Sequence, residues 1–279
     1  MKKLLLCMAH PDDESFFVGG TVATYVKDGW DVTLAVATKG QMGVTGGAPM
    51  EPEILGAARQ AETEKAAQIL GIKTIKWLDQ KDSRLKECTP GTLEDPLHDI
   101  MLELLPDVVI TFDTLGCDNH PDHIKMSYAT TYAFQKYAAH LHNLKNLEFK
   151  GRGRAFYHAE YERSFGESHA VSDEPKLYYV SMPKSVCSFM KKEKQMENEA
   201  HGKPLVGSDD KKITTVIDIE AINLEKGKAL LCHETQMEKV DAFISFPANP
   251  WVKQEYFILR MQGIYEVIMG KNDHITSEL

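Results

Sequence analysis

The 279-residue sequence has few cysteines, no excess of basic charge and no long hydrophobic run. Its five cysteines are odd in number and widely spaced, and none forms a CxxC pair, which argues against a disulfide framework and favours a reducing compartment. Because 41 acidic residues outnumber 32 basic ones, the chain lacks the basic surface with which a general nucleic-acid-binding protein neutralises phosphates. We therefore expect no nucleic-acid partner.

The longest apolar stretches are too short for a membrane or a secretory signal. No stretch approaches the roughly 18 apolar residues of a membrane-spanning helix. The apolar run near the N-terminus covers only residues 4–9, and charged residues follow it directly. A secretory signal needs a core of about 7–15 apolar residues. We expect a cytoplasmic protein without a transmembrane segment.

Strand and helix patterns alternate along the first half of the chain. Short and almost wholly apolar runs, typical of parallel strands buried on both faces, are separated by helical patterns. Strands are predicted at 4–9, 31–38, 74–78 and 107–112, and helices at 14–27, 53–70, 93–105 and from 121 to about 142. Such alternation with short connections predicts an α/β fold with a Rossmann-like, mostly parallel sheet and helices on both faces.

The second half of the chain is less regular, and we expect it to form an elaborated C-terminal part of the fold. Strands are predicted at 177–182, 213–219 and 256–261, and a helix at 224–236. The polar residues 191–212 favour a solvated helix end followed by a loop, with a mobile flap over the site as the alternative. Because no repeat, low-complexity segment or clear boundary interrupts the chain, we expect a single domain over residues 1–279.

Two polar clusters follow predicted strands. The segment His10-Pro-Asp-Asp-Glu14 follows the first strand directly, and His120-Pro-Asp-His123 follows the 107–112 strand by a short loop. Burying unpartnered charges costs several kcal/mol each, so a cluster of this kind normally has a ligand. Ligands of parallel α/β sheets bind beyond the carboxyl ends of the strands. Both clusters are therefore expected at one edge of the sheet.

These clusters contain the donor types of a catalytic zinc site, in which two histidines and one carboxylate leave a fourth position free. A further carboxylate beside the metal can deprotonate water. The spacing leaves open which of Asp12 and Asp13 binds the metal and which acts as base. It also leaves iron and manganese as alternatives to zinc, and an N-cap role for either aspartate as the structural alternative.

Together the two motifs resemble the PIG-L/LmbE-like family of zinc-dependent deacetylases, which act on N-acetylglucosaminyl compounds. Supporting similarities lie in Thr38-Lys-Gly40 with Gly43, in a helix containing Arg59, Glu62, Ala66 and Leu70-Gly71, and in a late helix containing Lys228, Ala229, His233 and Gln236. Asp118 and Asn119 depart from the family, many members of which have glycine there. Residues 150–210 match no family pattern, and we expect them to carry specificity.

The resemblance assigns roles that the spacing leaves open. It implies that His10, Asp13 and His123 bind Zn²⁺ and that Asp12 is the general base. His120 would act as a general acid or would stabilise the tetrahedral oxyanion.

By the same resemblance, three further residues belong to the pocket. Arg59 would contact a sugar hydroxyl or an appended anion, with a salt bridge on a helix face as the alternative. His233 and Gln236 would line or buttress the pocket. The expected reaction is hydrolysis of the acetamide of a small N-acetylated amino-sugar conjugate, and the family implies a homo-oligomer, a trimer or hexamer.

Three other functions are alternatives. The nearest is hydrolysis of another amide, in an antibiotic or a thiol-cofactor conjugate, within the same pocket. A non-catalytic metal- or sugar-binding protein would not require Asp12. A nucleotide-binding oxidoreductase would require a GxGxxG phosphate cradle after the first strand, where HPDDE stands instead.

Overall fold

The computed structural model describes residues 1–46, 48–149, 174–267 and 276–279. Residues 150–173, the first part of the region expected to carry specificity, lie outside the described residues. The single domain over residues 1–279 stays a prediction.

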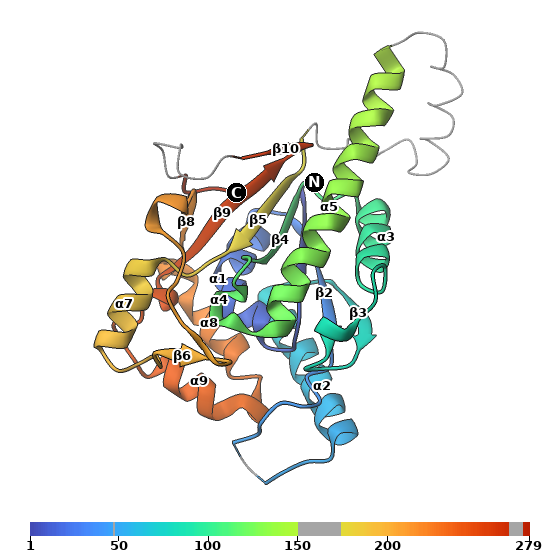
Figure 1. Ribbon diagram of the computed structural model, residues 1–279. Helices are drawn as coiled ribbons and strands as arrows, with labels where there is room; N and C mark the ends of the chain where they lie inside the picture. The colour runs from blue at the N-terminus through green and yellow to red at the C-terminus, as the bar shows by residue number, and fades with distance from the viewer. Residues whose placement is uncertain (47, 150–173, 268–275) are drawn as a thin grey trace.

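A twisted central sheet organises the described part of the chain (Figure 1). Its five parallel strands are β1 (Lys3–Met8), β2 (Asp31–Thr38), β3 (Thr74–Gln80), β4 (Val108–Phe112) and β5 (Lys176–Val180). They lie in the order β3-β2-β1-β4-β5, and the antiparallel strand β9 (Gln254–Gln262) pairs with β5. Two short strands, β8 (Thr215–Asp218) and β10 (Tyr265–Glu266), pair with β9. The predicted fold class is confirmed.

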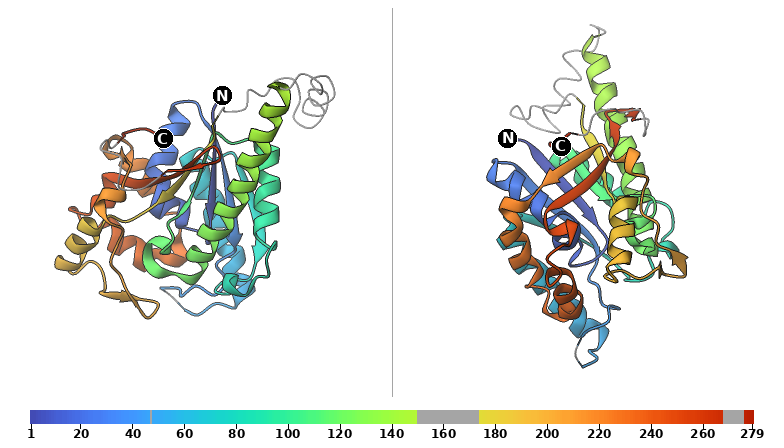
Figure 2. Two further views of the ribbon diagram at one scale, coloured as in Figure 1. Left: turned by 45° about the horizontal axis from the view of Figure 1, so that its top comes forward. Right: turned by 90° about the vertical axis from the view of Figure 1, so that its left-hand side faces the viewer.

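Helices cover both faces of this sheet (Figures 1 and 2). One layer contains α1 (Asp13–Lys27), α2 (Pro52–Leu70) and α8 (Asn223–Leu230), which pack against one another. The other contains α3 (Glu94–Leu104) and the long α5 (Pro121–Phe149). Because both faces are covered, β1 is apolar from Leu4 to Met8, and Leu4, Leu5 and Leu6 are buried.

The order of the strands creates a crevice at the centre of the sheet. The chain proceeds from β1 through β2 to β3 on one side and then returns to β4 on the other side of β1. At such a switch point the loops after the two central strands diverge, which leaves a binding crevice at their carboxyl ends. The two polar clusters follow these two strands, β1 and β4.

The second half of the chain contains the main differences from the prediction. The helix predicted at 224–236 is wrong in its extent, because α8 ends at Leu230 and a 3₁₀ turn, η4 (Glu234–Gln236), follows it. The sequence patterns also did not predict α7 (Lys184–Lys192). After α7 comes a hairpin of β6 (Glu199–Ala200) and β7 (Lys203–Pro204).

The hairpin is attached to Asn119, the last residue of the short helix α4 (Gly116–Asn119) that precedes α5. The Asn119 Nδ2 atom donates to the carbonyl oxygens of Lys203 and Pro204, at 3.3 and 3.1 Å. His201, at the turn of the hairpin, lines the same pocket as the two polar clusters. Within residues 191–212, α7 ends at Lys192, as the predicted helix end requires, and Gln195, Met196 and His201 line the pocket. The mobile flap stays a prediction.

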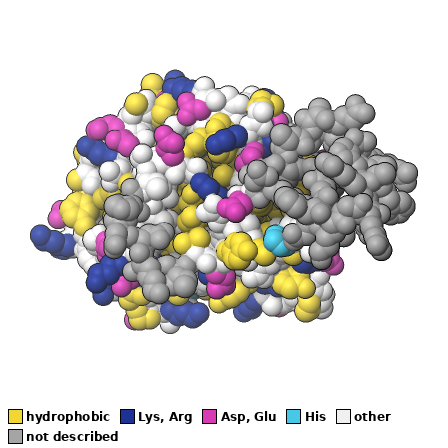
Figure 3. All heavy atoms as spheres, turned by 90° about the horizontal axis from the view of Figure 1, so that it is seen from above, with side chains coloured by type: hydrophobic (Ala, Val, Ile, Leu, Met, Phe, Trp, Pro, Cys, Tyr) yellow, Lys and Arg dark blue, Asp and Glu magenta, His cyan; other side chains and the backbone are white. Residues whose placement is uncertain are grey.

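The outer surface carries both signs of charge. Seen from above Figure 1, at the end where β1 begins, acidic and basic side chains are interspersed with hydrophobic ones (Figure 3). Within the described ranges, no helix is both long enough and apolar enough to cross a membrane. The cytoplasmic location and the homo-oligomer stay predictions.

Candidate metal centre

The first cluster lies in a tight turn between β1 and α1. The Asp13 Oδ2 atom accepts hydrogen bonds from the backbone N–H groups of Ala9 and His10, at 3.1 and 2.8 Å. Asp12, directly before the helix, has a φ of 93°, in the left-handed region that costs a residue other than glycine about 1–2 kcal/mol. Strain of this kind is typical of functional sites. The turn brings His10, Asp12 and Asp13 to the pocket lining.

The second cluster lies at the start of α5, after the short helix α4 (Gly116–Asn119). Gly116 has a φ of 67°, and a Cβ atom there would lie 2.8 Å from the Cβ atom of His123. Phe112, the last residue of β4, stacks on the His123 ring at a centroid distance of 4.1 Å. Glycine on one side and phenylalanine on the other thus fix the position of this imidazole.

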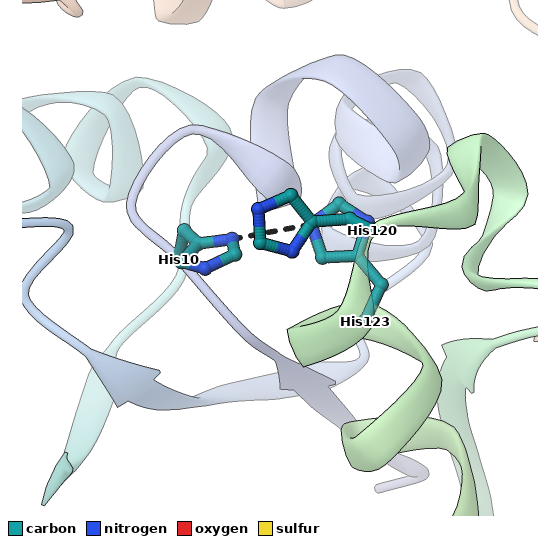
Figure 4. A group of neighbouring side chains, drawn as sticks. All are labelled: His10, His120 and His123. Atoms are coloured by element: carbon teal, nitrogen blue, oxygen red, sulfur yellow. Dashed lines mark hydrogen bonds between the residues drawn. The ribbon is translucent and has the colours of Figure 1, made fainter. Parts of the chain in front are cut away.

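The two clusters meet at the switch point, where His10 approaches from one side and His120 and His123 from the other (Figure 4). His10 Nδ1 and His123 Nε2 are 3.1 Å apart. Asp13 Oδ1 lies 3.4 Å from His123 Nε2, and Asp13 Oδ2 lies 3.8 Å from His10 Nδ1. Four ligands bound tetrahedrally to zinc at 2.0–2.1 Å lie about 3.3 Å apart. The nitrogens of His10 and His123 therefore have the spacing of two ligands of one metal ion, and Asp13 faces them with a different oxygen toward each.

Two groups of donors, neither of which includes Asp13, are close enough together to hold a metal ion. Ring nitrogens of His10, His120 and His123 lie within 4.8 Å of one another, and so do donor atoms of His10, Asp82 and Asp122. The second group uses the far side of the His10 ring, since Nε2 lies 3.2 Å from Asp82 and 3.3 Å from Asp122. An oxygen of each carboxylate also accepts a backbone N–H, from Met42 in the case of Asp82. These contacts favour a role for Asp82 and Asp122 as outer residues that orient the His10 ring, rather than as metal ligands.

His123 has a matching outer partner. Its Nδ1 atom lies 3.0 Å from Asp118 Oδ1 and 3.1 Å from the carbonyl oxygen of Gly116, so both acceptors orient the ring with Nε2 toward Asp13. Carboxylates behind the metal-ligating histidines are common in metal sites because they fix the tautomer and the ring orientation. The residues Asp82, Asp118 and Asp122 were not among the predicted site residues. Asp118, the departure from the family pattern, belongs to this outer set.

The carboxylates hold protons on the two imidazoles. Burial lowers the pKa of His10, but hydrogen bonds to Asp122 and Asp82 outweigh it and raise the pKa to about 9. Burial also lowers the pKa of His123, but Asp118 and Asp13 outweigh it and raise this pKa well above its usual value. A divalent cation can replace these two protons, because binding a metal requires neutral imidazoles and anionic carboxylates. The charges around His10, Asp13 and His123, which we call the cage, thus favour the binding of a cation.

Asp12 lies beside this cage and is held by Arg59 from α2. Arg59 Nη2 donates to Asp12 Oδ2 at 2.9 Å and to the carbonyl oxygen of Pro11 at 2.7 Å, while Nη1 donates to the carbonyl oxygen of Gly40 at 2.9 Å. Burial raises the pKa of Asp12, although Arg59 opposes this shift. The Arg59 guanidinium, predicted to contact the substrate, is thus bound to Asp12 and to the backbone.

The contacts of Arg59 explain why the loop after β2 contains glycine. A Cβ atom at Gly40, whose φ is 64°, would overlap the Arg59 guanidinium, and one at Gly43 would lie 2.6 Å from Arg59 Nη1. Glycine at both positions lets the guanidinium lie against the backbone. The loop therefore acts on Asp12 through Arg59.

The two predicted residues from the late helix have different surroundings. His233 is fully buried, and its Nε2 atom lies 2.9 Å from Glu14 and 3.2 Å from the Ser15 hydroxyl, so it supports the first turn of α1. Gln236 lines the pocket, and its Nε2 atom donates to the carbonyl oxygen of Val44 at 3.2 Å. The Gln236 Oε1 atom is buried and has no hydrogen-bond partner among the described residues.

His120 is partly exposed at the pocket. Its Nδ1 atom accepts the backbone N–H of Asp122 at 3.2 Å, so the neutral ring carries its hydrogen on Nε2. Burial, together with the nearby His10 and His123, lowers the pKa of His120 to about 4. The ring is therefore a neutral hydrogen-bond donor near pH 7.

The pocket has a volume of about 690 Å³. The predicted residues that line it are His10, Asp12, Asp13, Arg59, His120, His123 and Gln236. The parallel α/β sheet and the buried histidines and aspartates at its switch point define the class. It is an α/β protein with a candidate metal-binding cluster at the carboxyl ends of its central strands.

Comparison with known proteins supports the resemblance that the two motifs predict. Residues 5–134 match the family model described as PIG-L: GlcNAc-PI de-N-acetylase. The predicted resemblance to the PIG-L/LmbE-like family is confirmed.

Curated relatives extend the similarity beyond this region. The 1D-myo-inositol 2-acetamido-2-deoxy-alpha-D-glucopyranoside deacetylase of Rhodococcus erythropolis is 29% identical, over 92% of this chain and 90% of the relative. The probable N-acetyl-alpha-D-glucosaminyl L-malate deacetylase 2 of Bacillus anthracis is 37% identical, over 44% of this chain and 54% of the relative. These names support the prediction that the chain is a hydrolytic enzyme of the deacetylase type.

Solved structures share the fold. The N,N'-diacetylchitobiose deacetylase of Pyrococcus horikoshii aligns with a TM-score of 0.61 and 22% identity, over 99% of this chain and 86% of that one. The 4-carboxy-2-hydroxymuconate hydratase GalB of Pseudomonas putida KT2440 aligns with a TM-score of 0.62 and 17% identity, over 96% and 98%. Since a hydratase shares this architecture, the fold alone does not define the reaction.

Proposed function

We propose that the protein is a zinc-dependent de-N-acetylase that hydrolyses the acetamide of a small N-acetylated amino-sugar conjugate. The observation that carries the proposal is the combination of a metal cage, formed by His10, Asp13 and His123, with the separately held carboxylate of Asp12. A binding protein needs the cage but not the additional carboxylate. The family and its curated relatives support an amino sugar as substrate.

The donor set suits zinc. Two imidazole nitrogens and one carboxylate oxygen leave a fourth position for water or substrate, as in catalytic zinc sites. A zinc ion bound there supplies a Lewis acid that polarises the amide carbonyl and makes water more acidic. Asp82 and Asp122 behind His10, and Asp118 behind His123, hold the two ligands in orientation.

Asp12 takes a proton from the attacking water. Arg59 holds one of its oxygens, so that the carboxylate keeps a fixed orientation toward the pocket. After water adds to the carbonyl carbon, the departing nitrogen needs a proton, and Asp12 returns the one it has taken. The products are acetate and a free amino sugar, which balances the atoms of one amide and one water.

His120 stabilises the oxyanion. Its Nε2–H is free to donate into the pocket because Nδ1 accepts a backbone N–H. A neutral donor stabilises the negative charge that develops on the carbonyl oxygen. Of the two roles expected for this residue, these contacts favour oxyanion stabilisation over the general acid.

A substrate panel tests the proposal. Purified protein loaded with zinc is incubated with N-acetylglucosaminyl conjugates of inositol and malate, with diacetylchitobiose and with acetylated antibiotic and thiol-cofactor conjugates, and acetate and free amine are measured. We expect equal amounts of the two products from an amino sugar, loss of activity with a chelator and recovery with zinc. Turnover that resists complete metal removal, or exclusive turnover of the other amides, would contradict the proposal.

A further inference from the structure

The pocket has an apolar side that the proposed chemistry does not use. The polar residues of the cage lie at the carboxyl ends of β1 and β4. Beyond them, the pocket is lined by large hydrophobic side chains from α1, from α7 and the residues around it, and from α9 (Met237–Ile244) and the residues after it. These side chains are Phe16, Phe17, Met182, Met190, Met196, Phe243 and Trp251.

One part of this lining, which we call the methionine wall, consists of Met182, Met190 and Met196. Met182 and Met190 are buried, with 8 and 7% of their surface exposed. The Met196 sulfur atom lies 3.8 Å from the sulfur of Cys187 on α7. Methionine is unbranched and polarisable, so a group of methionines adapts to apolar ligands of irregular shape.

The methionine wall is attached to the rest of the site. Lys191, at the end of α7, donates through Nζ to the carbonyl oxygen of Leu205, and thereby links the helix to the segment after the β6–β7 hairpin. Asn119, beside His120, donates to the hairpin itself. Figure 1 shows α7, β6 and α9 on one side of the sheet ends. The methionine wall is therefore a built side of the pocket and not a loose surface loop.

Its size and chemistry exceed what an N-acetylated sugar ring needs. A volume of about 690 Å³ falls in the range of about 300–1,000 Å³ that accommodates drug-sized ligands. A polyol such as inositol needs hydrogen-bonding groups, which Gln195, His201 and Gln236 supply on only part of the lining, and a dicarboxylate such as malate needs cations. The Arg59 guanidinium is bound to Asp12 and to backbone carbonyls. Lys239 also lines the pocket but is exposed, so an ion pair formed with it would be in contact with solvent and would contribute little.

The pocket is also lined by exposed apolar side chains. Met42 and Val44, on the loop after β2, line the pocket and are 59 and 81% exposed. Exposed apolar side chains, together with the buried methionine wall, suit a ligand with a substantial apolar part.

We infer that the substrate carries an apolar alkyl or aromatic group next to its N-acetylated sugar, and that this group lies against the methionine wall. The inference rests on the proposed function and specifies its substrate class. It distinguishes this chain from its curated relatives, whose names specify inositol and malate as the group attached to the sugar.

A matched pair of glycosides tests the inference. Hexyl and methyl N-acetylglucosaminides of the same anomeric configuration differ by five methylene groups, each worth about fourfold in affinity when fully buried. With partial burial, we expect kcat/KM to be about 10- to 100-fold higher for the hexyl glycoside. The inositol and malate conjugates should not exceed the methyl glycoside.

Two variants locate the effect on the methionine wall. Met190→Gln and Met196→Gln replace a thioether by an amide of similar length, so each should reduce the ratio of hexyl to methyl kcat/KM about five- to tenfold. Met190→Leu should retain most of the ratio. Met50→Gln, at an exposed methionine outside the pocket lining, is the matched control and should leave the ratio unchanged.

The outcomes separate the inference from the proposed function. Equal rates on the two glycosides, or higher rates on the inositol or malate conjugate, overturn the inference and retain the deacetylase. Acetate release from no glycoside overturns the proposed function. In that case, calorimetric titration with hexyl glucoside, which has no acetyl group, still tests the methionine wall: binding weakened by Met196→Gln supports it, and absence of binding overturns it.

Discussion

The pocket has a polar side around His10, Asp13 and His123, which we call the floor. The floor and the methionine wall are built in opposite ways. The floor consists of the segments after two neighbouring strands, β1 and β4, and nearly every polar atom in it has a partner within the cage. The wall consists of apolar side chains from α7 and the segments around it, linked to the site through backbone carbonyls. A hydrogen-bonded floor tolerates little change because its groups depend on one another, whereas an apolar wall tolerates exchange of similar volumes.

This contrast predicts two kinds of variant. Changes in the floor should remove the metal or the chemistry, and changes in the wall should alter only which substrate is preferred. The following predictions test the contrast, beginning with the largest expected effect.

His123→Ala should remove both metal and activity. His123 lies on the first turn of α5, and its Nε2 atom is 3.1 Å from His10 Nδ1. Elemental analysis should show about one zinc per chain in the unchanged protein and strong loss in the variant. His98→Ala, on α3, is the control and should keep the metal.

The same variant distinguishes the alternative donor groups. If the ion were held by His10, Asp82 and Asp122, His123→Ala would keep full zinc occupancy, and the proposed ligand set would be wrong. If His120 were a ligand, His120→Ala would lose metal as well.

Asp12→Asn should keep the metal and the fold but lower kcat by about 10²- to 10⁴-fold, the usual effect of losing a general base. The amide retains the size of the side chain and its contact with Arg59, but it cannot accept the proton of water. Initial rates and zinc content are measured together. Asp95→Asn, an exposed carboxylate on α3, is the control, and near-normal turnover of Asp12→Asn would place the base elsewhere.

His120→Ala should lower kcat by about 10²- to 10³-fold, as loss of one oxyanion donor typically does, with little change in KM. Zinc content should stay unchanged. His120→Gln, which presents an amide N–H, should recover part of kcat, because the proposed role needs a donor and not a titrating group. Equal loss in both variants would instead favour the general acid role.

The fold and the centre of the floor could be predicted because their signals are local. A strand buried on both faces is apolar over its whole length, and a polar cluster directly after it must lie at the sheet edge. The two motifs then identify His10, Asp12, Asp13, His120 and His123 as site residues, and the structure brings these five together.

The outer residues could not be predicted in this way. Asp82 follows β3, which is separated from β1 by β2, and its contact with His10 depends on the path of the loop between. By resemblance to the family, Arg59 was expected at the substrate, whereas its partner Asp12 lies 47 positions away in the sequence and was not identified. In both cases the residue type was visible, but its partner is defined only by tertiary structure.

The late helix shows why its predicted extent was wrong. The helix was predicted to continue to Gln236, but His233 adopts φ −85° and ψ 62°, outside the helical region. This departure accompanies the buried contact of His233 with Glu14 at 2.9 Å. Helix propensity is worth less than about 1 kcal/mol per residue, so tertiary contacts commonly override it. The helix α7 was also missed; it is only nine residues long, and Val186, Cys187 and Met190 are its buried residues.

The smallest expected effect separates backbone strain from the position of Arg59. Gly29 and Gly40 both have a positive φ, 84° and 64°, so alanine at either position should cost about 1 kcal/mol of stability. At Gly29, the added Cβ atom meets nothing within 4 Å, whereas at Gly40 it meets the guanidinium of Arg59.

Only Gly40→Ala should therefore lower activity, by about tenfold in kcat, because the displaced guanidinium no longer fixes Asp12 and misplacement of a catalytic group by about 1 Å has effects up to about 10²-fold. Thermal unfolding of the two variants checks that their losses of stability are similar, and zinc content checks that the cage is intact. Equal activity of Gly29→Ala and Gly40→Ala would show that Arg59 does not position Asp12. A loss in Gly40→Ala alone, at equal stability, would assign the glycine loop to the chemistry of the floor rather than to its folding.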